Sequence, residues 1–126
     1  MGERLSIYAN QIGAWESFTL PKEERTPKHR LARTMEEVDE LIEAVGAYDG
    51  SDKAKANVKK EASDVMVGLL GIMLEVGGDP DAIMTTTIQD ILAKYPQREI
   101  KKDLDAGVPR SVTMERHKVL WKREKH

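Results

Sequence analysis

The sequence contains no cysteine, and this absence limits the kinds of site that it can build. A disulfide framework and a thiolate zinc site are both excluded, so only oxygen or histidine ligands remain for a metal ion. Aromatic side chains are also few, with one Phe, two Trp and three Tyr in 126 residues. Any metal site is therefore expected to hold a hard cation through oxygen atoms.

Long apolar runs are missing as well. The N-terminal stretch MGERLSIYANQIG lacks the continuous apolar segment of a signal peptide, and the longest apolar stretch, at residues 65–74, is too short to span a bilayer. The net charge of −2 gives no global basic field that would favour nucleic acid. We expect a cytoplasmic protein that forms a single domain over residues 1–126, with no membrane or nucleic-acid partner.

Helical periodicity is the dominant pattern, and no strand-like alternation extends beyond a few residues. Prolines, glycines and turn clusters separate the helical stretches. The prediction is an all-α, four-helix-bundle-like domain with a core over about residues 5–100 and a short C-terminal helical tail over about 101–126. The expected helices cover residues 5–18, 28–47, 53–76, 80–95 and 112–124.

Two acidic pairs lie on the second and third expected helices. Glu37 and Glu40 are three residues apart, as are Glu61 and Asp64, so each pair presents two carboxylates on one helix face. In an antiparallel hairpin, residues at equal height have numbers that add to a constant. Glu37 with Asp64 and Glu40 with Glu61 give the same total, and the centre falls inside the turn cluster YDGSD. The hairpin therefore predicts that all four carboxylates meet at one level.

Four acids at one level would repel each other at neutral pH unless a cation lies between them. Ligation by carboxylates alone suits Mg²⁺ or Mn²⁺. The other interpretation is an ordinary solvated acidic surface. It explains Glu61 and Asp64 poorly, because they lie on the most apolar helix and uncompensated acids are rarely buried.

The motif Glu37-x-x-Glu40, followed after twenty residues by Glu61-x-x-Asp64, resembles the signature of the MazG-like all-α nucleoside triphosphate pyrophosphohydrolases. The segments LARTMEEVDELIEA, KKEASDVMVGLL and AKYPQRE resemble that family too, and the likeness covers about residues 5–100. It implies Mg²⁺, with Mn²⁺ as a substitute, bound by the four motif acids. It also implies hydrolysis of a nucleoside triphosphate, expected to be a deoxynucleoside triphosphate, to the monophosphate and pyrophosphate. The resemblance places a metal-activated water at the α-phosphate and implies a homodimer or homotetramer.

Several further residues are candidates for the same reaction. Glu36 lies next to the metal ligands and is the candidate for orienting or deprotonating the attacking water, although a plain solvent-facing acid is the alternative. Resemblance suggests phosphate contacts from Lys94 and Arg98, and helical spacing suggests Arg33, Arg30 and Lys60. On the first helix, Trp15 and Gln11 are candidates for binding the base, although Trp15 could instead be a core residue.

The chain departs from the family pattern at Thr87 and Ile91, where many relatives carry a lysine and an asparagine. This departure leaves a second function open. The protein could be a non-catalytic helical module, with a metal-binding, nucleotide-binding or regulatory role, that lacks the family's usual contacts with the triphosphate. A third possibility is a helical bundle that binds nucleic acid through its basic tail at residues 113–126. No residue in the sequence selects among the bases.

Overall fold

The structure is a computed structural model that describes residues 3–125, and within this range it contains helices and no strand. The predicted all-α class is confirmed. His126, the last residue of the predicted tail, lies outside the described residues. The elements in chain order are α1 (Arg4–Thr19), the 3-10 helix η1 (Lys22–Glu24), α2 (Pro27–Gly46), α3 (Asp52–Glu75), α4 (Pro80–Lys94), α5 (Gln97–Asp105) and α6 (Arg110–Lys125).

Helix ends follow the local sequence signals. The Thr26 side chain accepts a hydrogen bond from the His29 backbone N–H at 3.2 Å, and Pro27 occupies the first position of α2. The Ser51 hydroxyl caps α3 in the same way by accepting from the Ala54 backbone N–H at 3.2 Å. As a result, the five helices predicted from periodicity begin and end within about two residues of their observed bounds.

The short helix α5 was not predicted. Its sequence QREIKKDLD contains only two apolar residues, Ile100 and Leu104, which is too little apolar pattern for periodicity to reveal. The helix starts directly after Tyr95-Pro96 and ends where Gly107 adopts a φ of 87°. A Val108 backbone N–H donates to the Asp103 carbonyl at 2.9 Å and closes this end.

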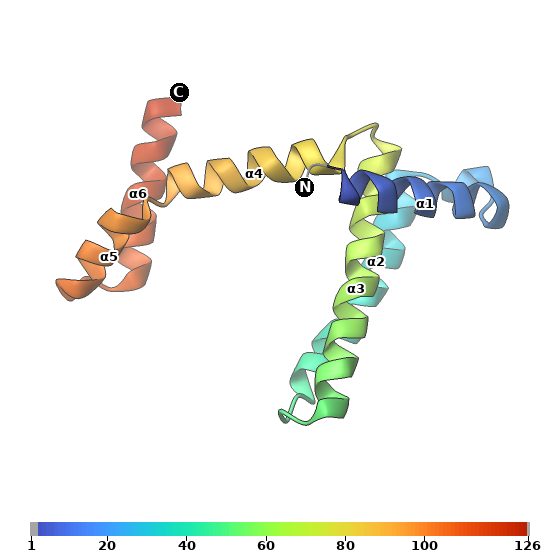
Figure 1. Cartoon of the computed structure of the whole chain (residues 1–126), viewed down its shortest axis with the longest axis horizontal. Helices are drawn as coiled ribbons and strands as arrows, with labels where there is room; N and C mark the ends of the chain where they lie inside the picture. Colours follow the sequence, from blue (N-terminus) through green and yellow to red (C-terminus); the bar gives the residue numbers. More distant parts are fainter. Residues whose placement is uncertain (1–2, 126) are drawn as a thin grey trace. The chain divides into compact units, whose positions relative to one another are not determined.

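The chain divides into two compact units, one ending at Ala82 and the other beginning at Ile83. In the first unit α2 and α3 form a hairpin and lie side by side, and α1 packs against α3 (Figure 1). In the second unit α5 packs against α6. The single-domain expectation for residues 1–126 stays a prediction.

The first turn of α1 is capped by a distant residue of the same unit. The Asp81 carboxylate accepts hydrogen bonds from the backbone N–H groups of Leu5 at 3.2 Å and Ser6 at 2.9 Å. Burial by itself raises the pKa of Asp81, but these bonds to Ser6 and Leu5 outweigh it, so that the pKa is lowered overall. This contact ties the start of α4 to the start of α1.

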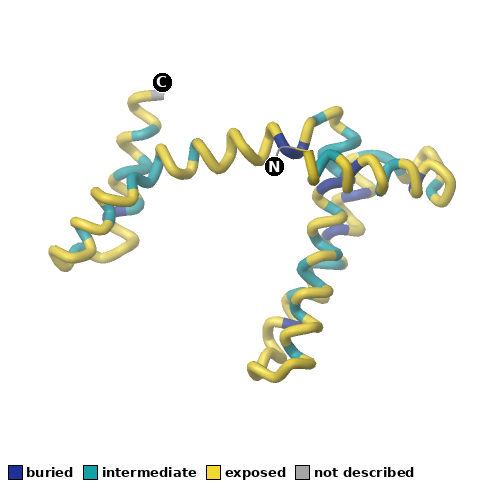
Figure 2. Tube along the Cα trace, in the orientation of Figure 1, coloured by how far each residue is buried: buried dark blue, intermediate teal, exposed yellow. Residues whose placement is uncertain are grey.

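The interior of the first unit is small and partly ionic. Its buried apolar residues are Ala9, Ala44 and Leu70, and several charged or polar residues are buried beside them (Figure 2). Arg30 of α2 joins three helices, because Nη1 lies 2.7 Å from Glu16 Oε2 of α1 and Nη2 lies 2.8 Å from Glu75 Oε1 of α3.

Glycines on α3 provide the space for these contacts. A Cβ atom added at Gly71 would meet the Arg30 guanidinium, and one added at Gly68 would meet the Thr34 side chain. The observed positions of the Arg30 and Thr34 side chains against α3 therefore depend on the absence of side chains at Gly71 and Gly68. Among the described residues, no helix is both long and apolar enough to cross a membrane.

Candidate metal centre

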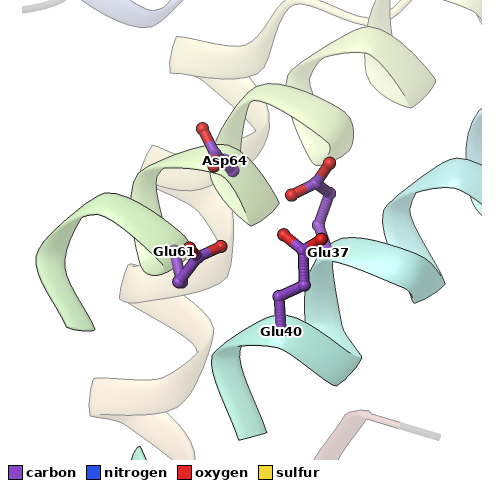
Figure 3. A group of neighbouring side chains, drawn as sticks. All are labelled: Glu37, Glu40, Glu61 and Asp64. Atoms are coloured by element: carbon purple, nitrogen blue, oxygen red, sulfur yellow. The ribbon is translucent and has the colours of Figure 1, made fainter. Parts of the chain in front are cut away.

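The α2–α3 hairpin brings the two acidic pairs together. Glu37 and Glu40 come from α2 and Glu61 and Asp64 from α3, and one carboxylate oxygen of each lies within 4.8 Å of the others (Figure 3). The turn between the helices contains Gly50, whose φ of 83° suits a residue without a Cβ atom. The expected meeting of the four acids at one level is confirmed. Their role as metal ligands stays a prediction.

Two oxygens of this acidic cluster are buried without a donor. Glu37 Oε2 and Glu61 Oε2 have no hydrogen-bond partner among the described residues, and the Glu61 side chain is only 12% exposed. Leaving a buried carboxylate oxygen unsatisfied is costly. Because each ligand atom is a hard carboxylate oxygen, the donor set fits an ion such as Mg²⁺ or Mn²⁺.

The acids of the cluster also affect each other's ionisation. A hydrogen bond shared with Glu61, together with the negative charges of Glu37 and Glu61, raises the pKa of Glu40 above its ordinary value of 4.5. Such a shift means that the fully ionised cluster is unfavourable without a positive partner. The raised pKa of Glu40 and the two buried oxygens without a donor therefore both favour binding of a cation at this cluster.

Lys60 is the cation that the described structure places on the cluster. Its Nζ donates to Asp64 Oδ2 at 3.2 Å and to Glu61 Oε1 at 3.3 Å, and these two contacts raise the pKa of Lys60. The Lys60 side chain is 67% exposed, so this is a solvent-screened pair of little strength. Lys60 can leave the acids at small cost when another cation binds.

A cavity of about 330 Å³ adjoins the acids within the first unit. Its walls include Glu37 and Asp64 of the cluster and three residues that the sequence nominated for substrate binding. Trp15 is 62% exposed and its neighbour on α1, Phe18, is 93% exposed, so neither is a core residue of this chain. The nominated residues in the cavity wall are Gln11, Trp15 and Arg33.

The other nominated residues lie elsewhere. Glu36 is exposed on α2 beside Glu37. Arg30 lines the cavity, but both terminal nitrogens of its guanidinium are held by carboxylates. Lys94 and Arg98 belong to the second unit, where Lys94 Nζ lies 4.9 Å from the ring centroid of Trp121. Their contact with a phosphate stays a prediction.

Sequence reasoning missed the partners of Arg30. Glu16 and Glu75 fix its guanidinium, and Glu16 also lines the cavity together with Leu20 and Glu24. The nearest signal in the sequence was the position of Arg30 opposite Gly71 in the hairpin. Nothing local indicated Glu16, because its pairing depends on how α1 packs against α3.

Comparison with known protein families gives a match. Residues 25–101 match the family model of the MazG nucleotide pyrophosphohydrolase domain. The match covers more than half of the chain and contains all four acids of the cluster. A search of curated proteins and a search of solved structures each found no match.

Proposed function

The chain belongs to the MazG nucleotide pyrophosphohydrolase family, and from this premise we propose that it hydrolyses a deoxynucleoside triphosphate to the monophosphate and pyrophosphate. The observation that carries the proposal is the acidic cluster inside the matched region, with a cavity directly beside it. With a cation bound, the acids of the cluster would hold the phosphates, and the cavity supplies a place for the nucleoside.

We expect Glu37, Glu40, Glu61 and Asp64 to hold Mg²⁺, with Mn²⁺ as a substitute. The two unsatisfied buried oxygens and the raised pKa of Glu40 support this expectation. When bound, such an ion neutralises phosphate oxygens and lowers the pKa of a coordinated water.

The reaction needs a base for the attacking water. In the proposed step the water oxygen forms a bond to the α-phosphorus, the bond from that phosphorus to the bridging oxygen breaks, and pyrophosphate leaves with the bridging oxygen. Glu36 accepts the proton that the water loses. Its support is its exposure and its place on α2 directly before Glu37.

The remaining nominated residues bind the substrate in this proposal. The Trp15 ring stacks on the base and the Gln11 amide hydrogen-bonds to it, since both line the cavity. Arg33 lines the same cavity and contacts phosphate oxygens, and Lys60 turns from the acids to the phosphates. Lys94 and Arg98, which belong to the second unit, stay candidates for phosphate contact on the resemblance alone.

We also propose that the protein is a homodimer or homotetramer. The apolar side chains of α2 that point away from the hairpin seam are largely exposed, which is unusual for a stable monomer. A second copy would cover them. The residues concerned on α2 are Leu31, Met35, Ile42 and Val45.

The test is pyrophosphate release from a full panel of ordinary and modified nucleoside triphosphates, with Mg²⁺ or Mn²⁺ and with a chelator. We expect Glu61→Gln to lower kcat/KM by about a hundredfold or more, because it removes a charged ligand. Glu43→Gln is the matched control, since Glu43 is an exposed acid of α2 outside the cluster. Absence of turnover for every substrate, or full activity of Glu61→Gln, would overturn the proposal.

A second candidate function is nucleotide binding without turnover. It rests on Thr87 and Ile91, which stand where many relatives carry a lysine and an asparagine. The Thr87 hydroxyl donates to the Ile83 carbonyl at 2.8 Å, and Ile91 is an exposed apolar residue. Calorimetric binding of a non-hydrolysable triphosphate, combined with no pyrophosphate release, would favour this candidate.

A further inference from the structure

The wall of the cavity contains two carboxylates that do not belong to the acidic cluster. Glu16 comes from α1 and Glu24 from η1. The Glu16 side chain is only 9% exposed, whereas Glu24 is an exposed residue. Because both line the space next to the acids, both can contact the nucleoside part of a substrate whose phosphates lie at the cluster.

Arg30 holds the Glu16 carboxylate in a fixed place. Nη1 of Arg30 lies 2.7 Å from Oε2 of Glu16, and Nη2 lies 2.8 Å from Oε1 of Glu75. This ion pair compensates the buried charge of Glu16 and restricts the orientation of its carboxylate. A carboxylate has about four acceptor positions, and a contact with one nitrogen occupies one of them. Glu16 can therefore accept further hydrogen bonds from a ligand in the cavity.

Hydrogen-bond donors for a base are few in the same wall. The Thr34 hydroxyl donates its proton to the Arg30 carbonyl at 2.7 Å, and both terminal nitrogens of Arg30 are held by carboxylates. In the proposed function Arg33 contacts phosphate and the Trp15 ring stacks on the base. The Gln11 amide then remains as the lining side chain that can donate to the edge of the base.

We propose that Glu16 and Glu24 select a base that carries an exocyclic amino group, as cytosine, adenine and guanine do, against uracil and thymine. This inference rests on the proposed function, because it names the substrate class of the same site. An ionised carboxylate only accepts hydrogen bonds, and an amino group donates them. Uracil and thymine have one N–H on the edge that pairs in nucleic acids, and it lies between two keto oxygens. A carboxylate that approaches this N–H also meets a keto oxygen, which repels it.

The burial of Glu16 gives the selection its strength. A buried acceptor that loses water without gaining a donor is costly, so a site built to bind an N–H group discriminates against a ligand that lacks it. The competing interpretation is that Glu16 serves only as the partner of Arg30. A purely structural role would lower activity toward all bases alike, whereas selection by Glu16 would change the ratio between them.

The first test measures kcat/KM of the wild type for dCTP, dATP, dGTP, dUTP and dTTP with Mg²⁺. We expect the best amino-bearing substrate to exceed both keto substrates by about tenfold or more. Glu16→Gln should reduce this ratio several-fold, because the amide keeps the shape of the side chain and offers an N–H that a keto oxygen accepts. A wild-type preference for dUTP or dTTP overturns the proposal. So does an unchanged ratio in a Glu16→Gln protein whose circular dichroism shows the native helix content.

A second pair of variants tests the selection without touching the buried ion pair. Glu23 and Glu24 are neighbouring exposed acids of η1, but only Glu24 lines the cavity among the residues of this helix. Glu24→Gln should lower the same ratio, and the matched control Glu23→Gln should leave it unchanged. If Glu16→Gln does not fold, an unchanged ratio in Glu24→Gln overturns the proposal. An equal fall in both variants of η1 also overturns it, because it would show a general effect of charge.

Calorimetric binding of the α,β-imido analogues of the same five triphosphates separates this inference from the proposed function. Absence of pyrophosphate release from every substrate would overturn the proposed function. Tighter binding of an amino-bearing analogue, with the preference lost in Glu16→Gln, would still support the selection of the base. Turnover without a preference for an amino-bearing base would overturn this inference and leave the proposed function standing. Absence of both turnover and binding would overturn both.

Discussion

At the scale of single residues, each acid of the cluster is a common side chain, but their proximity to one another makes full ionisation of the group unfavourable. Glu40 shows this most directly, because its pKa is raised by the hydrogen bond with Glu61 and by the charges of Glu61 and Glu37. An acid whose pKa is higher in the folded protein favours folding when protonated and disfavours it when ionised. The cluster thus destabilises the metal-free protein at neutral pH.

This predicts a pH dependence that Glu40→Gln should remove. In chelator, Glu40 contributes most to stability below its unfolded pKa, and the contribution is lost as pH rises through its raised folded pKa, above 4.5. At pH 7 the metal-free Glu40→Gln protein should therefore melt at a higher temperature than the wild type, and the difference should vanish near pH 4. Thermal denaturation followed by circular dichroism measures this.

Added Mg²⁺ provides the control for that experiment. It should stabilise the wild type and have a smaller effect on Glu40→Gln, because the variant lacks one charged ligand. Equal melting temperatures of the two metal-free proteins at pH 7 would contradict the interpretation of the cluster as uncompensated negative charge.

At the scale of elements, one buried guanidinium holds α1 against the hairpin. Burial by itself lowers the pKa of Arg30, but its hydrogen bonds with Glu16 and Glu75 outweigh this and raise it overall. Arg30 therefore stays charged, and its two partners bring acids of α1 and α3 to the same residue of α2. The position of α1 matters for the site, because α1 supplies Gln11 and Trp15 to the cavity.

We predict that Arg30→Met lowers the free energy of unfolding by about 3–5 kcal/mol, because it leaves two carboxylates without their buried partner. Urea denaturation measures the change. Arg33→Met is the matched control, since Arg33 is exposed on the same helix and should change stability by no more than about 0.5 kcal/mol. A similar small loss for Arg30→Met would mean that the ion pairs do not position α1.

At the scale of the whole molecule, far more large apolar side chains are exposed than buried among the described residues. Its buried apolar residues are Ala9, Ala44 and Leu70, whereas Met35, Ile42 and many other large apolar side chains are exposed. Hydrophobic burial is the main force that stabilises folded proteins. Association with further copies would supply the burial that a single chain lacks.

This predicts that thermal stability depends on protein concentration. The melting temperature of the wild type should rise over a hundredfold increase in concentration, because mass action favours an associated folded state. Ile42→Glu, on the exposed face of α2, should abolish most of this dependence, whereas Glu43→Gln should leave it intact. A melting temperature independent of concentration in the wild type would contradict the proposed homo-oligomer.

The sequence by itself determined the features that depend on local chemistry. Side-chain periodicity predicted five helices, and the caps at Thr26 and Ser51 start two of them. The turn, centred between Gly50 and Ser51, set which residues of α2 and α3 lie at the same height in the hairpin. The register was enough to bring Glu37 and Glu40 to Glu61 and Asp64. Each of these signals acts between neighbouring residues or across a single turn, so it can be predicted without knowing the rest of the fold.

Only the tertiary structure decided how distant segments combine. The capping of α1 by Asp81, the burial of Arg30 between Glu16 and Glu75, and the cavity beside the acids all join residues far apart in the chain. The helix α5 was also not predicted, because its nine residues include only two apolar ones, too few to show a helical periodicity. The distant contacts share one physical reason. Periodicity in the sequence predicts which face of a helix carries apolar or small residues, but only the packing of the folded chain decides which other helix that face contacts.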